Sequence, residues 1–209
     1  MIKAIIFDLD SCLAAANEAG DHLYAPAFAA IRAANDGSVS ESTLSAAFDE
    51  CWRCAFDAVA AKHGFTGAMF TAGWNAFASL EITGSMRGYD DLALVKELPV
   101  TRFLVTSGFR RLQESKVRAL GFADWFAAIH IDAIDEPCRK GKLGIFEGIS
   151  AACRVRPEEV LVVGDNPESE IEAGNRLGMR TIQILRPGVV WSDRTAAHIR
   201  GLDELRRYC

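Results

Sequence analysis

The chain has 209 residues, of which 50% are hydrophobic and 24% charged, and its net charge at pH 7 is −5. This length and apolar content are enough for one α/β core and a smaller additional unit. The acidic balance argues against a nucleic-acid partner, and the chain has no apolar run of about 18 residues that would predict a membrane span. We therefore expect a soluble cytoplasmic protein with no nucleic-acid or membrane partner, either a monomer or a homodimer, with its scattered cysteines reduced.

The first predicted element is an apolar strand near the N-terminus that ends in Asp8 and Asp10. Residues two apart in a strand point to the same side, so these carboxylates would lie close together at the end of the strand. Their mutual repulsion favours a bound cation between them. A purely structural explanation competes with this one, because Asp is also common in turns and at helix N-caps.

Residues 14–88 are rich in Ala and Phe, show helical periodicity and lack strand-like runs of Val and Ile. They predict a small helical cap domain inserted after the first strand. Residues 1–13 and 89–209 would then form the α/β core, with hinges near residues 14–18 and 84–88.

A capping-box pattern at residues 38–41 and a glycine at Gly64 predict one long helical stretch within this insert. A further helix would contain Met69 and Trp74. The Cys-x-x-Cys pair of Cys51 and Cys54 would lie on one face of the long helix, which favours packing over a metal or redox role.

After the insert, strand-like and helix-like segments alternate. Strands are predicted at residues 102–108, 128–131, 160–165 and 180–185, and helices at residues 110–120, 143–153 and 169–177. Such alternation indicates an α/β fold with a Rossmann-like three-layer core and a mostly parallel sheet.

Polar residues follow three of the predicted strands. They are Asp8 and Asp10, then Thr106, Ser107 and Gly108, and finally Asp165. The carboxyl ends of parallel strands meet at one edge of a sheet, so these residues would face a common crevice. Hydroxyls and backbone N–H groups suit phosphate oxygens, and carboxylates suit a cation.

A basic segment, residues 139–142, precedes the predicted helix at 143–153. With it, the order acid-x-acid, Thr-Ser-Gly, lysine and Gly-Asp resembles the four motifs of the haloacid dehalogenase (HAD) superfamily, in particular phosphatases with a C1 helical cap that are similar to phosphoglycolate phosphatase. The resemblance implies a Mg²⁺-dependent phosphomonoester hydrolase acting on a small phosphorylated metabolite, with the cap as a lid over the site.

The resemblance also implies a role for each motif. Asp8 would be the nucleophile that forms an aspartyl-phosphate, and Asp10 the acid and base. Mg²⁺ would be bound by the carboxylates of Asp8 and Asp165 and by the main-chain carbonyl of Asp10. Thr106, Ser107, Gly108 and a lysine would contact the phosphoryl group.

The motif lysine is either Lys140 or Lys142. Spacing favours Lys140, because this family's pattern places the lysine six residues before a phenylalanine, here Phe146. Lys142 stays an alternative, since a flexible ammonium can reach the same oxygen from either position.

The chain departs from the family pattern at Ser11 and Cys12, where Gly and Thr are usual, and at Glu170, where many relatives carry Asp. Serine is tolerable at that position unless positive φ is required. Glu170 would ligate the metal directly, act through a water or orient its neighbours.

These departures motivate one alternative, a catalytically weakened phosphate-binding or regulatory protein. A sugar phosphomutase is a second alternative, because an aspartyl-phosphate can also return its phosphoryl group to a sugar. A dehalogenase is disfavoured by Asp10, since such enzymes need no acid for the leaving group.

Overall fold

A computed structural model describes all 209 residues and contains one six-stranded sheet of parallel strands in the order β3-β2-β1-β4-β5-β6. The N-terminal strand is central, so both of its neighbours come from later parts of the chain. This arrangement confirms the predicted α/β fold. The strands are β1 Ala4–Phe7, β2 Thr101–Gly108, β3 Ala128–Ala133, β4 Val160–Gly164, β5 Arg180–Ile184 and β6 Ala197–Ile199.

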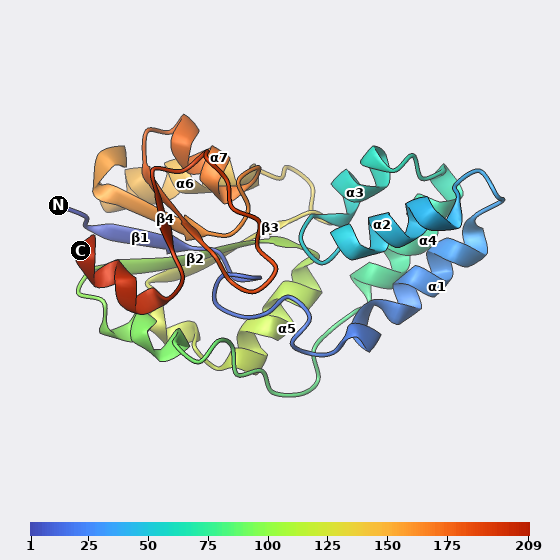
Figure 1. Ribbon diagram of the computed structural model, residues 1–209, viewed down its shortest axis with the longest axis horizontal. Coiled ribbons are helices and arrows are strands. Elements are labelled where there is room, and N and C mark those ends of the chain that lie inside the picture. The colour runs from blue at the N-terminus through green and yellow to red at the C-terminus, as the bar shows by residue number, and fades with distance from the viewer.

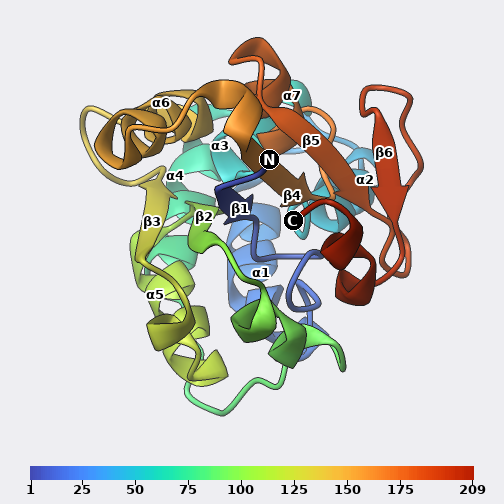
Figure 2. The same ribbon diagram turned by 90° about the vertical axis from the view of Figure 1, so that its left-hand side faces the viewer.

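Helices cover both faces of the sheet (Figures 1 and 2). On one face lies α5 (Arg110–Leu120), and on the other lie α6 (Gly141–Cys153) and α7 (Glu170–Arg176). Each face of the sheet carries a cluster of buried apolar side chains, and alternate residues of β1 belong to the two clusters. Ile5 and Phe7 pack on the side of α5, and Ala4 and Ile6 pack on the side of α6 and α7. Burial on both faces explains why β1 is a continuous apolar run rather than an alternating one.

Short 3-10 helices complete the core. They are η2 Leu92–Glu97, η3 Ala123–Trp125, η4 Pro157–Glu159 and η5 Leu202–Arg207. No helix of the structure has the length and hydrophobicity that a membrane crossing requires.

The insert after β1 is helical, as predicted, and lies to one end of the sheet in Figure 1. We call this insert the cap. It consists of η1 Asp21–Tyr24, α1 Ala25–Ala34, α2 Glu41–Glu50, α3 Phe56–Lys62 and α4 Gly67–Ala78.

The cap packs on the core through apolar side chains. Its buried cluster includes Phe109, Leu112 and Ile134, which belong to the core. Phe109 immediately follows β2 and stacks on Phe77 of α4, with ring centroids 5.8 Å apart. The cap is therefore held against the edge of the sheet where the strands end.

The two chain segments that join cap and core are also tied together. The carboxylate of Glu18 accepts hydrogen bonds from the backbone N–H groups of Arg87 and Gly88. These residues lie in the two segments where the sequence predicts hinges, so any movement there would carry both segments at once.

The prediction of one long helix after residue 40 is wrong. A helix begins near the predicted capping box, but its N-cap is Ser40 rather than Ser38, and the Ser40 side chain accepts a hydrogen bond from the N–H of Thr43. This helix, α2, ends at Glu50, and α3 begins only at Phe56. Cys51 and Cys54 consequently lie at a helix end and in the turn that follows, not on one helix face.

Tertiary contacts explain this break, which contains neither Gly nor Pro. The ring of Trp52 stacks on Tyr24 with centroids 3.9 Å apart. The Arg53 guanidinium donates to the carbonyl of Gly188, and the Arg53 carbonyl accepts a hydrogen bond from Asn166 at 3.5 Å. Such contacts override helix propensity, and they bring this turn of the cap to the core.

Candidate active site

Three buried acids meet at the carboxyl edge of the sheet. Asp8 follows β1, Asp165 follows β4 and Glu170 begins α7, and oxygens of the three lie within 4.8 Å of one another. Gly164 makes this approach possible, because a Cβ at that position would lie 2.2 Å from Oε1 of Glu170. The predicted acids at two strand ends are thus brought together, and Glu170 joins them.

Lys142 is the lysine that reaches these acids. Its side chain is 8% exposed, and its Nζ donates to Oδ1 of Asp8 at 2.7 Å and to Oε2 of Glu170 at 2.8 Å. Burial lowers the pKa of Lys142, but the carboxylates of Asp8 and Glu170 raise it by more, so its pKa lies above the usual value and the side chain stays charged. One ammonium against three carboxylates leaves an excess of negative charge that a divalent cation would neutralise.

Lys140, which the spacing favours, is exposed at the N-cap of α6 and contacts none of these acids. The backbone explains the difference. Gly141 has a φ of 67°, a left-handed conformation that glycine adopts easily, and it turns the chain so that the next side chain enters the core.

The acids fit a magnesium ion. No protein group donates a hydrogen bond to Oδ2 of Asp8 or to either carboxylate oxygen of Asp165, so these oxygens are available as ligands of a hard cation. Both carboxylate oxygens of Glu170 are engaged, one by Lys142 and the other by the N–H of Asn166 at 2.7 Å. Glu170 thus links Lys142 to the backbone that follows β4.

Burial raises the pKa of Asp8 to about 7 and that of Asp165 to about 8 in the metal-free protein. Glu170 adds repulsion in both cases, and the nearby Lys142 offsets only part of these effects. The two carboxyls are thus costly to ionise until a cation is bound.

The gain in stability from Mg²⁺ should therefore rise with pH. A carboxyl whose pKa is higher in the folded than in the unfolded state binds more protons when folded, so the metal-free protein loses stability between about pH 4 and pH 8. Mg²⁺ needs the ionised forms. At a Mg²⁺ concentration about 100 times Kd, we expect about 2.7 kcal/mol at pH 8, or roughly 5–10 °C in Tm, and little at pH 5.

Thermal melts with Mg²⁺ and with EDTA at the two pH values measure this difference. Asp165→Asn is the matched variant and should lose most of the pH-dependent gain. An equal gain at pH 5 and pH 8 would show that Mg²⁺ acts elsewhere on the protein.

Asp10 lies apart from this acidic cluster and has a lysine of its own. The Nζ of Lys116, on α5, lies 2.7 and 2.8 Å from the two carboxylate oxygens of Asp10. The sequence predicts one cation between Asp8 and Asp10, whereas the structure provides a separate ammonium for each. The sequence analysis did not identify Lys116. This lysine lies four positions from both Leu112 and Leu120, on the apolar stripe of a helix, and a charged residue in such a position indicates a buried partner.

The end of β2 contributes Thr106, Ser107 and Gly108 to the same edge. The Thr106 hydroxyl donates to Gln113 at 3.3 Å, and the Ser107 hydroxyl donates to buried Asp132 at 3.1 Å. Since Asp132 also accepts from Arg139 and from the N–H of Gly141, the Ser107 side chain is tied to the segment that precedes α6.

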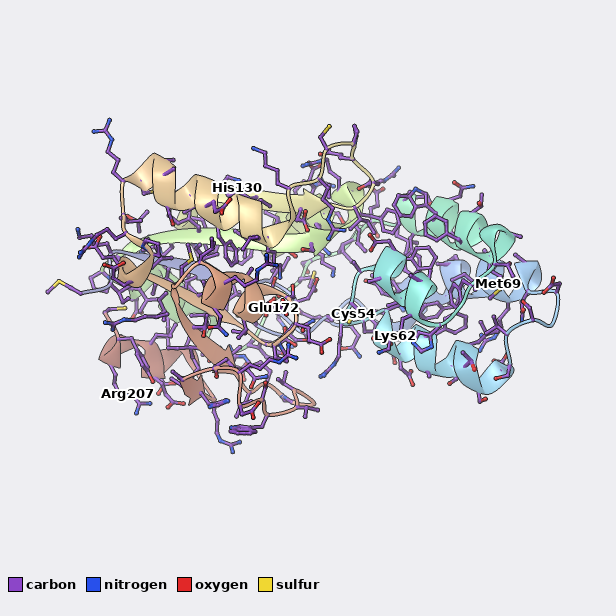
Figure 3. All side chains as sticks on the ribbon, turned by 90° about the horizontal axis from the view of Figure 1, so that it is seen from above. Cys54, Lys62, Met69, His130, Glu172 and Arg207 are labelled. Atoms are coloured by element: carbon purple, nitrogen blue, oxygen red, sulfur yellow. The ribbon has the colours of Figure 1, made fainter.

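A cavity of about 600 Å³ joins these groups to the cap. The core contributes the acids, Thr106 and Lys142, and the cap contributes residues of the turn between α2 and α3 together with Glu50 and Lys62. Figure 3 labels Cys54 and Lys62, which lie on the cap at the junction with the core. The turn at residues 51–55, which the sequence analysis predicted as helix, therefore forms part of the site.

Ser11 has a φ of 56°, so the position where the family usually has glycine does adopt the left-handed conformation. This conformation costs about 1 kcal/mol for an L-residue, whereas glycine adopts it freely.

Ser11→Gly should therefore raise stability by about 1 kcal/mol, or roughly 2–4 °C in Tm. Differential scanning calorimetry measures it, with Ser42→Gly on the exposed start of α2 as a control expected to lower Tm; a lower Tm for Ser11→Gly would contradict this interpretation.

Cys12, where the family usually has threonine, is fully buried. Its thiol lies 3.6 Å from the carbonyl oxygen of Val163 on β4, and its own carbonyl accepts a hydrogen bond from Arg186. Burial raises the pKa of this thiol, so it stays neutral. The thiol therefore packs against the end of β4.

The central parallel sheet, the acids at its carboxyl edge and the helical cap together place the candidate site between cap and core. Residues 2–178 match the family of haloacid dehalogenase-like hydrolases, and the chain belongs to that family. It is also 28% identical over 163 residues to enolase-phosphatase E1 of Sorangium cellulosum, an alignment that covers 77% of this chain and 60% of that protein.

Solved structures share the fold. A HAD phosphatase from Thermococcus onnurineus superposes with a TM-score of 0.64 at 21% identity, over 99% of this chain and 97% of the other. The HAD hydrolase YfnB from Bacillus subtilis, solved with bound magnesium, superposes with a TM-score of 0.63 at 14% identity, over 99% and 98% of the two chains.

Proposed function

We propose that the protein is a Mg²⁺-dependent phosphomonoester hydrolase that acts on a small phosphorylated metabolite through an aspartyl-phosphate on Asp8. The observation that carries this proposal is the position of Asp8, which lies among two further buried acids and Lys142 and lines the cavity that Asp10 and Thr106 also line. The magnesium bound in YfnB, whose fold is similar, and the similarity to enolase-phosphatase E1 support the same chemistry.

In this proposal, Mg²⁺ is held by the carboxylates of Asp8 and Asp165 and by the main-chain carbonyl of Asp10. The ion supplies positive charge that offsets the charge of the acids and of the phosphoryl group. An ammonium has three N–H donors, and Lys142 uses two of them, so the third is available to a phosphoryl oxygen. The backbone at Ser107 and Gly108 would bind the other oxygens, and so would the Thr106 hydroxyl once its proton turns from Gln113 to the phosphoryl group.

Two steps follow from this arrangement. A carboxylate oxygen of Asp8 attacks phosphorus, the bond from phosphorus to the ester oxygen breaks, and Asp10 gives its proton to the departing oxygen. Asp10 then takes a proton from a water that attacks the same phosphorus, which releases inorganic phosphate and restores the Asp8 carboxylate. Each proton that Asp10 loses in the first step is regained in the second.

The cap would serve as a lid of the C1 type, as in phosphatases similar to phosphoglycolate phosphatase. Its turn at residues 51–55 already contacts the core beside Asp165, through Arg53 and Asn166. A closed cap excludes water before the phosphoryl group is transferred and selects the group attached to the phosphate.

The test is phosphate release from p-nitrophenyl phosphate and from a panel of sugar, nucleotide and short-chain acid phosphates, with Mg²⁺ and with EDTA. Turnover that needs Mg²⁺ supports the proposal and ranks the substrates. Turnover that requires a sugar bisphosphate would indicate a phosphomutase instead. Folded protein that binds Mg²⁺ but hydrolyses no compound would indicate a phosphate-binding or regulatory member of the family.

A further inference from the structure

Lys116 is a buried lysine that the two chemical steps above do not use. Its side chain is 2% exposed, and it contacts the carboxylate of Asp10, which is 21% exposed. Burial lowers the pKa of Lys116, but Asp10 of the core and Tyr24 of the cap raise it by more, so its pKa lies above the usual value and the side chain stays charged. A buried ammonium is costly unless it is paired, and this one is paired with a single residue of the first motif.

The contact has a defined geometry. The Nζ of Lys116 lies 2.7 Å from Oδ1 and 2.8 Å from Oδ2 of Asp10, so one ammonium binds both oxygens and restricts rotation of the carboxylate. A carboxylate held by one oxygen only would keep more freedom.

Gln113 adds a second anchor from the same helix. Residues 113 and 116 are three apart on α5 and therefore neighbours on its surface. The Gln113 amide donates to Oδ2 of Asp10 at 3.4 Å, and its carbonyl oxygen accepts from the Thr106 hydroxyl at 3.3 Å. One face of α5 thus connects Asp10 of the first motif to Thr106 of the second.

Packing alone does not explain these residues. Lys116 and Gln113 are both buried, on a helix whose other buried positions include Leu112 and Val117. Apolar side chains of similar length would fill the same space without the cost of burying an ammonium and an amide. Their polar ends converge on Asp10, which lines the cavity.

We propose that Lys116, assisted by Gln113, is a positioning residue that fixes the Asp10 carboxylate on the leaving-group side of the site. This inference rests on the proposed function, because it specifies how that function's acid and base is held. Lys116 also offsets the charge of Asp10, so the side of the cavity that receives the departing group carries less negative charge than the acids alone would give it.

The proposal predicts a selective loss of activity. A primary alkyl phosphate needs a proton on its departing oxygen, whereas p-nitrophenolate leaves without one. In the full chain, Lys116→Met should lower kcat/KM for the alkyl ester roughly 100-fold, the scale of general acid catalysis, and change kcat/KM for p-nitrophenyl phosphate only a few-fold. Lys116→Arg should restore part of the alkyl activity, and Lys96→Met, at an exposed lysine of η2, is the matched control.

Two results would overturn the proposal. An equal loss for both esters, together with a lower Tm, would mean that Lys116 only supports the fold. A higher rate with the alkyl ester would mean that Lys116 holds Asp10 away from the substrate. Lys116→Gln, which keeps a hydrogen-bond donor and a polar chain, is the second variant if Lys116→Met does not fold.

Failure of the proposed function can be told apart from failure of this inference. If the unmodified protein hydrolyses neither ester, the function is wrong, and the crystal structure of Lys116→Met then tests the positioning directly. A displaced Asp10 carboxylate that has lost Gln113 supports the inference. An Asp10 that stays in place contradicts it.

Discussion

Replacing Asp8 with asparagine is expected to lower Mg²⁺-dependent phosphate release by roughly four orders of magnitude or more, the scale seen when a catalytic nucleophile is removed. Asparagine has nearly the size of aspartate, but it lacks the carboxylate oxygen that would attack phosphorus. The measurement is phosphate release in the presence of Mg²⁺, with Asp124→Asn at an exposed position as the matched control.

The fold should survive this substitution. Burial already raises the pKa of Asp8, so a neutral side chain removes an unfavourable charge, and Lys142 keeps its contact with Glu170. Tm in EDTA at pH 8 should therefore not decrease. Substantial Mg²⁺-dependent turnover by a folded Asp8→Asn protein would contradict the assignment of the nucleophile.

Lys142→Met should abolish activity and also destabilise the protein. It removes the only ammonium that contacts Asp8 and Glu170. Breaking a buried ion pair typically costs about 3–5 kcal/mol, or roughly 6–20 °C in Tm for a chain of this size. The loss should be larger at pH 8 than at pH 5, because the raised pKa of Asp8 lets that carboxyl become neutral at low pH.

Lys140→Met is the comparison that separates the two candidate lysines. Lys140 is exposed and has no acidic partner. Its replacement should change the free energy of unfolding by less than about 0.5 kcal/mol and leave turnover nearly unchanged. Thermal melts and phosphate release measure both variants. A severe loss with Lys140→Met and a mild one with Lys142→Met would reverse the assignment.

The strands and the acids at their ends were predictable from the sequence because local patterns determine them. Continuous apolar runs that stop at an acid mark β1 and β4, and an apolar stripe on a polar helix marks α5, whose bounds the prediction matched. Two parallel strands side by side then bring Asp8 and Asp165 together without further information.

Long-range contacts decided the rest. The choice between Lys140 and Lys142 depends on the left-handed turn at Gly141, and motif spacing carries no information about backbone direction there. The break between α2 and α3 depends on the stacking of Trp52 on Tyr24, two residues that lie on separate elements. The pairing of Lys116 with Asp10 joins positions more than a hundred residues apart, so only the charge on an apolar helix stripe indicated that it had a partner.

The central claim is that Asp8 accepts the phosphoryl group, and trapping that intermediate tests it most directly. The protein is mixed with Mg²⁺ and its best phosphate ester, quenched in acid within milliseconds and digested, and the peptides are analysed by mass spectrometry. We predict a phosphoryl group on the peptide that contains Asp8, absent with EDTA and in Asp8→Asn. Rapid phosphate release with no such adduct, or an adduct on another residue, would contradict the mechanism.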